Sequence, residues 1–151
     1  MLNDIYSRRI LEFAADIPHL GKMADADGSA TAHSKLCGST VTVYLKVDGN
    51  TVIDFAHVVK ACALGQASSS IMGRHAIGST VEELRVVRDE MHRMLRSGGA
   101  PPSGKWVDLA LLEPARELKA RHASILLTFD AVVEALSQAQ TAKEGHGVDR
   151  A

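Results

Sequence analysis

The sequence predicts an α+β fold, in which a small antiparallel sheet of about three strands has helices packed on one face. Residues 40–47 alternate polar and apolar side chains, and a strong turn signal at residues 48–50 precedes a return strand over residues 51–59. Beyond residue 62 the apolar residues recur at three- and four-residue spacings, which indicate helices. Because strands come first and helices follow, the order favours α+β over alternating units.

The remaining elements follow from similar patterns. A short strand over residues 30–35 precedes the hairpin, and residues 97–104, rich in glycine and proline, form an internal loop. Residues 78–83 hold a capping box, which starts a helix that runs to residue 94 or 95. We expect one helix before the sheet and three or four after it, at residues 4–15, from residue 62 onward, and at about 79–94, 105–119 and 122–138.

Length and composition limit the class of protein. A chain of 151 residues that is 46% hydrophobic can form one domain with a real core, and we expect it over residues 1–141, followed by a flexible polar tail over residues 142–151. A net charge of −1 argues against nucleic acid as a partner. No apolar run is long enough to cross a membrane, and the first residues do not resemble a secretory signal. We therefore expect a cytoplasmic protein.

Cys37 and Cys62 are the two cysteines, and they lie at the two ends of the predicted hairpin. In the cytoplasm they are expected as thiols, not as a disulfide. A two-residue loop would place Cys37 opposite Cys62. A three-residue loop would pair Val47 with Thr51 and place Cys37 opposite Ala61; we expect this register, because it gathers apolar residues on one face. Either register brings the thiols close together, which predicts a soft metal site.

The sequence suggests which other residues could join the thiols. Cys62 lies at or just before the first turn of a helix, where free N–H groups and the helix dipole stabilise the thiolate that a metal requires. Among seven histidines, His122 opens the last long helix after the basic run at residues 119–121. That position alone is typical of a surface or capping histidine. His57 and His33 are further candidates.

These segments together resemble the U-type iron–sulfur cluster assembly scaffolds, the family of IscU, SufU and the N-terminal domain of NifU. In that family the first cysteine lies in a Cys-Gly-Asp turn, and the second opens a helix that small residues follow. The matching segments here are Cys37-Gly38-Ser39, and Cys62 with Ala67-Ser68-Ser69-Ser70. The His-Cys-Ser-Ile-Leu segment of IscU-like members is matched by residues 122–126, which read His-Ala-Ser-Ile-Leu.

The chain departs from the family at two ligand positions. Ser39 stands in place of the aspartate, and the third cysteine is absent. That cysteine corresponds to Ala123 in the intact His-x-Ser-Ile-Leu frame, or to Ser124 when it is counted three residues after Arg121 as in SufU-like members. We favour Ala123. The longer connection between Arg88 and the last helix is also closer to SufU-like members.

The resemblance implies a set of ligands that is one short. It assigns Cys37, Cys62 and His122 to iron or to an iron–sulfur cluster. A Cys₂His set leaves one position open on a tetrahedral ion, and a [2Fe–2S] cluster normally takes four protein ligands. The implied site is therefore labile, weak or completed by a partner.

The resemblance also implies a function without catalysis, namely a scaffold that binds iron or a labile cluster. A cysteine desulfurase would supply sulfur, and iron–sulfur client or carrier proteins would receive the cluster. Two alternatives stay open: a zinc-binding accessory protein in sulfur transfer, and a degenerate member that carries no cluster but still binds partners. An enzyme with a cysteine nucleophile is disfavoured, because no motif supplies a base and an oxyanion hole.

Overall fold

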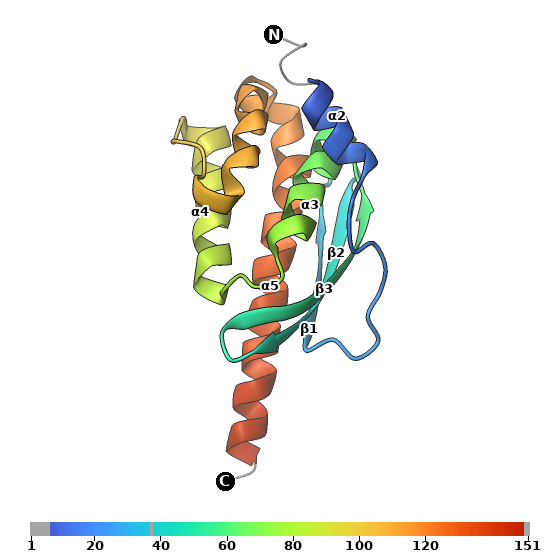
Figure 1. The fold of residues 1–151 in the computed structure, drawn as a ribbon, viewed down its shortest axis with the longest axis vertical. Coiled ribbons are helices and arrows are strands. Elements are labelled where there is room, and N and C mark those ends of the chain that lie inside the picture. The colour runs from blue at the N-terminus through green and yellow to red at the C-terminus, as the bar shows by residue number, and fades with distance from the viewer. Residues whose placement is uncertain (1–6, 37, 150–151) are drawn as a thin grey trace.

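The structure, a computed structural model, describes residues 7–36 and 38–149, with side chains through residue 142. Its elements are, in chain order, α2 (Arg8–Ala15), β1 (Gly28–His33), β2 (Thr40–Asp48), β3 (Thr51–Lys60), α3 (Ala63–His75), α4 (Val81–Ser97), the 3₁₀ segment η1 (Gly104–Glu117) and α5 (Lys119–Asp149). Figure 1 shows the sheet on one side, α3 and α5 packed against it, and α4 with η1 beyond them. The described residues thus confirm the expected α+β fold with helices on one face of the sheet.

The strands form an antiparallel sheet in the order β1-β2-β3. The turn between β2 and β3 is tighter than we expected, since Asp48 pairs with Thr51 and Val47 pairs with Val52. The expected pairing of Val47 with Thr51 is therefore wrong. Gly49, with φ of +61°, supplies the left-handed backbone that such a two-residue turn needs.

An irregularity between Lys46 and Val47 then shifts the register by one residue, so that Leu45 pairs with Phe55. Such a bulge adds one residue to one strand and turns its side chains over. As a result, Val52 and Phe55 are both buried although they are three residues apart, whereas Ile53 is 53% exposed. Only with this bulge can both Val52 and Phe55 of β3 be buried. The regular alternation of polar and apolar residues does not predict such a bulge.

Helix α5 is the central support of the molecule. It lies along β1 and β2 and also contacts α3 and α4 (Figure 1). Helix α3 approaches α5 closely, because small side chains face it: the Ser68 hydroxyl donates to the carbonyl oxygen of Ile125 at 2.7 Å. The serines of α3 are therefore buried packing residues.

Three segments have bounds or a helix type that differ from those the sequence predicts. Strand β1 begins two residues earlier than expected, at Gly28, and the expected weak helix near residues 105–119 is the 3₁₀ segment η1. Helix α5 continues to Asp149, so the backbone is helical through most of the segment expected as a flexible tail. The division into a domain over residues 1–141 and a tail stays a prediction.

None of the helices in the described part of the chain combines the length and the apolar character that crossing a membrane requires.

Replacing Gly28 by alanine is expected to destabilise the fold strongly. A Cβ at this buried position would overlap the carbonyl oxygen of Ala135 and lie 3.0 Å from the backbone nitrogen of Ala139, so α5 and β1 would have to separate. We expect a loss of about 3 kcal/mol in the free energy of unfolding, which thermal denaturation would show as a fall of roughly 6–12 °C. Ser29→Ala, at the neighbouring exposed position, is the control and should leave the melting temperature within about 1 °C.

Candidate functional site

Cys62 is the N-cap residue of α3, as the sequence predicts. Its side chain is half-buried, and its Sγ lies 3.3 Å from the Oγ of Ser124 on α5. The thiol therefore lies where the first turn of one helix meets the beginning of another.

The surroundings of Cys62 favour its thiolate. Burial by itself raises the pKa of this thiol, but the Ser124 hydroxyl, the backbone N–H groups of Gly65 and Leu64 and the charge of Arg121 outweigh it. The pKa of Cys62 consequently lies below the usual value for cysteine. A lower thiol pKa makes the thiolate easier to form, and the thiolate is the form of cysteine that acts as a nucleophile or binds a metal.

Gly65 makes the contact between Cys62 and Ser124 possible. A Cβ at Gly65 would lie 2.5 Å from the Ser124 Oγ and 3.0 Å from the Ser124 carbonyl oxygen. Only a residue without a side chain lets α5 approach the first turn of α3 this closely. From the sequence, Ser124 is a candidate only as a replacement for the third cysteine. Its hydrogen bond to Cys62 has no sequence signal, because it joins residues far apart in the chain.

Ser124→Ala is expected to raise the pKa of Cys62, because it removes a hydrogen bond that stabilises the thiolate. A hydrogen bond to a charged group contributes about 1.5 kcal/mol, so alkylation of Cys62 by iodoacetamide at pH 7 should slow by roughly tenfold. Peptide mass spectrometry over a pH series measures the rate at Cys62 separately from that at Cys37. Ser69→Ala is the matched control on α3, since Ser69 Oγ is buried without a hydrogen-bond partner in the described structure. An unchanged pH profile in Ser124→Ala would contradict this role for the hydroxyl.

The other cysteine segment forms a tight turn at its described residues. The N–H of Ser34 donates to the Ser39 carbonyl at 2.9 Å, the N–H of Gly38 donates to the Ser34 carbonyl at 2.9 Å, and Gly38 has φ of +71°. Ser39 is buried. Cys37 lies outside the described residues, so its place in the ligand set stays a prediction.

His122 is buried near the start of α5, so the interpretation of it as a surface histidine is wrong. Its Nε2 lies 3.0 Å from the carbonyl oxygen of Ala115 and 2.9 Å from that of Arg116. Carbonyl oxygens only accept hydrogen bonds, so Nε2 carries a proton, and Nδ1 is the ring nitrogen left to bind a metal ion. Histidine ligands of metals usually donate their other N–H to a carbonyl or carboxylate in this way.

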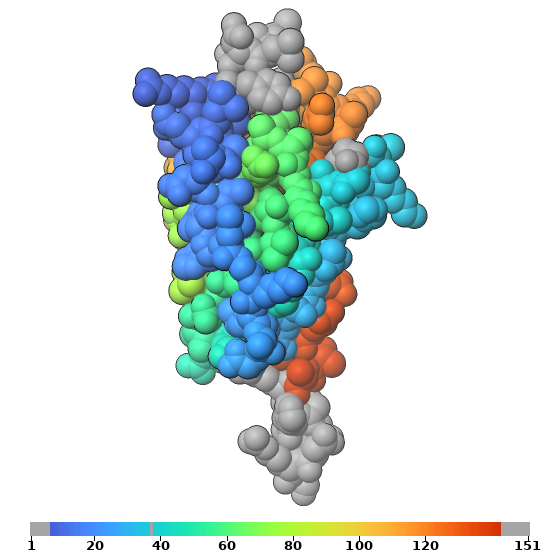
Figure 2. Space-filling model, turned by 90° about the vertical axis from the view of Figure 1, so that its right-hand side faces the viewer, coloured from blue at the N-terminus to red at the C-terminus, as the bar shows by residue number. Residues whose placement is uncertain are grey.

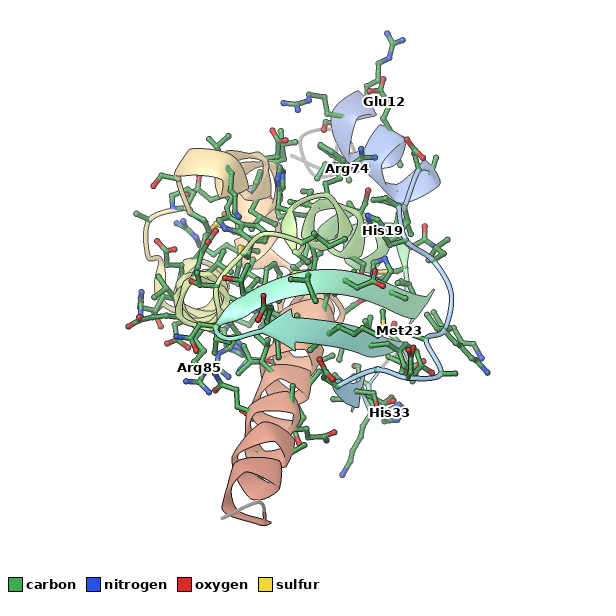
Figure 3. All side chains as sticks on the ribbon, turned by 60° about the horizontal axis from the view of Figure 1, so that its bottom comes forward. Glu12, His19, Met23, His33, Arg74 and Arg85 are labelled. Atoms are coloured by element: carbon green, nitrogen blue, oxygen red, sulfur yellow. The ribbon has the colours of Figure 1, made fainter. Side chains whose placement is uncertain are left out.

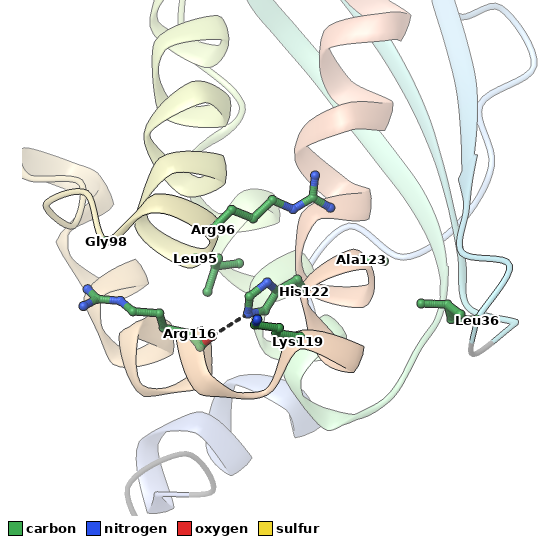
Figure 4. A pocket seen from close by; sticks show the side chains of 8 residues that line it. All are labelled: Leu36, Leu95, Arg96, Gly98, Arg116, Lys119, His122 and Ala123. Carbon is green, nitrogen blue, oxygen red and sulfur yellow. Dashed lines mark hydrogen bonds between the residues drawn. The ribbon is translucent and has the colours of Figure 1, made fainter.

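The imidazole of His122 lines a pocket of about 470 Å³ (Figure 4). In the figure, Ala123 lies between the imidazole and Leu36, the residue before Cys37. Figure 2 shows the segment around residue 36, the start of α3 and the segment that leads into α5 near one another toward the same end of the molecule. His122 therefore belongs to the same region as the turn over residues 34–39.

The reserve histidines have weaker claims. His57 is buried and donates its Nε2–H to the Pro18 carbonyl at 2.8 Å, and burial lowers its pKa, which keeps the ring neutral. Its Nδ1 is buried without a hydrogen-bond partner in the described part of the chain. His33 is exposed at the end of β1 (Figure 3).

Across residues 7–36 and 38–142, no group of three or more histidine, cysteine, aspartate or glutamate side chains could hold a metal ion. Cys62 is hydrogen-bonded to Ser124, and His122 lines a pocket together with Ala123. Ala123 and Ser124 are consecutive residues of α5. Of the three predicted ligands, Cys62 and His122 lie among the described residues.

The comparisons with known proteins agree with this fold. The profile of the family described as "NifU-like N terminal domain" matches residues 5–110, which is more than half of the chain. The chain belongs to this family. The N-terminal part of a nitrogen-fixing NifU-like protein from Brucella abortus, known from a crystal structure, has 57% identical residues and superimposes with a TM-score of 0.91, covering 93% of this chain and 97% of that one.

Two other relatives extend the likeness past the family match. The "Iron-sulfur cluster assembly scaffold protein IscU" of Thermotoga maritima is 31% identical over 134 residues, covering 89% of this chain and 94% of its own length. A crystal structure described as a putative scaffold protein for the SUF system, from Fervidobacterium Islandicum AW-1, has 24% identity and a TM-score of 0.79 over 89% of this chain and 98% of that one; it supports the fold alone. The family resemblance seen in the sequence is therefore confirmed.

Proposed function

We propose that this NifU-like protein is a scaffold on which an iron–sulfur cluster is assembled, with Cys37, Cys62 and His122 as its ligands. The cluster is a cargo, made here and then passed on. A cysteine desulfurase supplies the sulfur, and client or carrier proteins accept the product. The chain performs no catalysis of its own in this proposal, and a cytoplasmic location stays a prediction.

The observation that carries the proposal is the environment of Cys62. A half-buried thiol at a helix N-terminus, with a hydroxyl at 3.3 Å and a lowered pKa, is suited to receive sulfur or bind iron. A purely structural cysteine needs none of these groups and is usually buried in apolar surroundings, where its pKa rises.

The arrangement of the sheet supports the participation of Cys37. Thr40 pairs with Lys60, so the turn before β2 and the residues after β3 leave the sheet at the same end. Leu36 and Ala123 line one pocket, and Ser124, which follows Ala123, is hydrogen-bonded to Cys62. Leu36, the residue before Cys37, and Cys62 itself therefore lie beside two adjacent residues of α5.

The replacement of two family ligands makes the proposed site weak. Alanine at position 123 has no donor atom, and serine at position 39 is a poor ligand for iron beside thiolates. The set is one ligand short of the four that a [2Fe–2S] cluster takes. We therefore expect a labile cluster that is lost quickly to a chelator or to an acceptor protein, which suits a protein that hands its cluster on.

Anaerobic reconstitution tests the proposal. The purified chain is incubated with ferrous iron, a cysteine desulfurase, cysteine and a dithiol reductant that reduces the persulfide sulfur to sulfide. Iron, acid-labile sulfide and the visible spectrum are then measured. The proposal predicts equal amounts of iron and sulfide and transfer of the cluster to an apo-ferredoxin. Iron that binds without sulfide, or a cluster that forms equally well when Cys62 and Cys37 are both alanine, would contradict it.

The same preparation separates the two alternatives. A zinc-binding accessory protein in sulfur transfer would hold about one zinc ion per chain after purification without added iron, and iron would not displace it. A degenerate member would hold neither metal but would still bind the desulfurase in a pull-down. Metal analysis together with that pull-down distinguishes the three outcomes.

A further inference from the structure

The pocket beside His122 has properties that the proposed scaffold function does not explain. Three cationic side chains line it, namely Arg96 from the last turn of α4, Arg116 from the end of η1 and Lys119 from the start of α5. None of the residues that line it is acidic. Its volume of about 470 Å³ lies in the range of pockets that take small molecules.

Two of these cations are available to a ligand. Arg116 is partly engaged, since it donates to the Glu113 carboxylate at 3.0 Å and to the Met94 carbonyl at 3.2 Å. Arg96 and Lys119 are exposed and make no ion pair with any residue that the structure describes. The first turn of α5 adds the positive end of a helix dipole. An anion with one or more carboxylates fits this lining, because guanidinium and ammonium groups both bind carboxylates.

The other end of the pocket lies at the ligand position that the chain has lost. Ala123, which stands in place of the family's third cysteine, lines the same pocket as His122 (Figure 4). Leu36, the neighbour of Cys37, lines it too. A molecule held at the cations can therefore reach toward the vacant ligand position.

We propose that this pocket binds a small thiol that carries carboxylates, and that the sulfur of this thiol takes the ligand position left empty by Ala123. The carboxylates bind Arg96 and Lys119, and the thiolate completes the metal site. No bond other than the metal–sulfur bond forms, and the thiol loses its proton to solvent on coordination. The inference rests on the proposed function, because the thiolate needs a metal on Cys62 and His122.

Calorimetry with the reduced chain and reduced glutathione, a thiol with two carboxylates, tests the pocket without any metal. We expect glutathione and S-methylglutathione to bind the metal-free chain equally. The double variant Arg96→Gln/Lys119→Gln should bind both about tenfold more weakly, because it removes two charges from the pocket. The control Lys22→Gln/Arg85→Gln changes the net charge equally at exposed positions outside the pocket and should bind as the unchanged protein does; Figure 3 shows Arg85 near the other end of α4.

The zinc-loaded chain tests the sulfur. Here glutathione should bind at least about tenfold more tightly than S-methylglutathione, since only the free thiol can coordinate. That advantage should disappear in Ala123→Cys, which supplies its own thiolate.

Each remaining outcome has a definite meaning. Binding to the metal-free chain that does not depend on Arg96 and Lys119 overturns the pocket. Equal affinity of the two compounds for the zinc-loaded chain overturns the ligand role of the thiol. A chain that takes up no zinc overturns that role together with the proposed metal site, while the metal-free experiment still reports on the pocket separately.

Discussion

Ala123→Cys is expected to convert the labile site into a stable one. The variant restores a thiolate next to His122 and raises the ligand set from three to four, the number that a [2Fe–2S] cluster takes. We expect the half-life of the reconstituted cluster in the presence of a chelator to increase at least about tenfold, which corresponds to about 1.4 kcal/mol or more of additional stabilisation. The decay of the visible absorbance under anaerobic conditions measures it.

Ala123→Ser is the matched control for this prediction. It adds similar volume at the same partly buried position, but a serine hydroxyl is a poor iron ligand. A serine variant as stable as the cysteine variant would show that packing, not coordination, causes the gain. A cysteine variant with unchanged cluster decay would contradict the assignment of position 123 to the site.

Cys62→Ala is expected to abolish cluster assembly. The thiol contributes one of three proposed ligands, and its loss leaves Cys37 and His122, which cannot hold a cluster by themselves. Iron and sulfide after reconstitution should fall to below about a tenth of the amount in the unchanged protein. Mass spectrometry should also no longer detect the persulfide that sulfur transfer from the desulfurase forms at Cys62.

The fold should survive the substitution of Cys62. Because Cys62 is only half-buried, alanine there should change the melting temperature by no more than a few degrees. A folded Cys62→Ala variant that still binds iron and sulfide in full would contradict the role of this residue. Ser69→Ala, buried on the same helix, is the control for a general effect of changes in α3.

Local patterns were enough to predict the fold class, the hairpin and the position of Cys62 at the start of a helix. The bulge between Lys46 and Val47 could not be predicted, because it follows from the need to bury both Val52 and Phe55 against the helices, which is a tertiary demand. For the same reason, the alternation of polar and apolar residues predicted the wrong partner for Val47 at the turn between β2 and β3.

The site was only partly predictable for a similar reason. Spacing indicated Cys62, and the family resemblance indicated His122, but neither could show that Ser124 contacts the thiol or that His122 is fixed by two carbonyl oxygens. Those contacts join α3 to α5 and η1 to α5, and they depend on Gly65 and on the path of the 3₁₀ segment. The cationic pocket likewise gathers residues from three elements and has no signature in any one of them.

Titration of the metal-free chain with Co²⁺ shows whether Cys37 and Cys62 share one metal ion, because the sulfur-to-cobalt charge-transfer absorbance reports the number of thiolates on the ion. If Cys37 and Cys62 bind one ion, the chain takes up one Co²⁺, and each single cysteine-to-alanine variant loses about half of that absorbance and binds at least about tenfold more weakly. Two independent Co²⁺ ions per chain, or full absorbance in either single variant, would contradict a shared site.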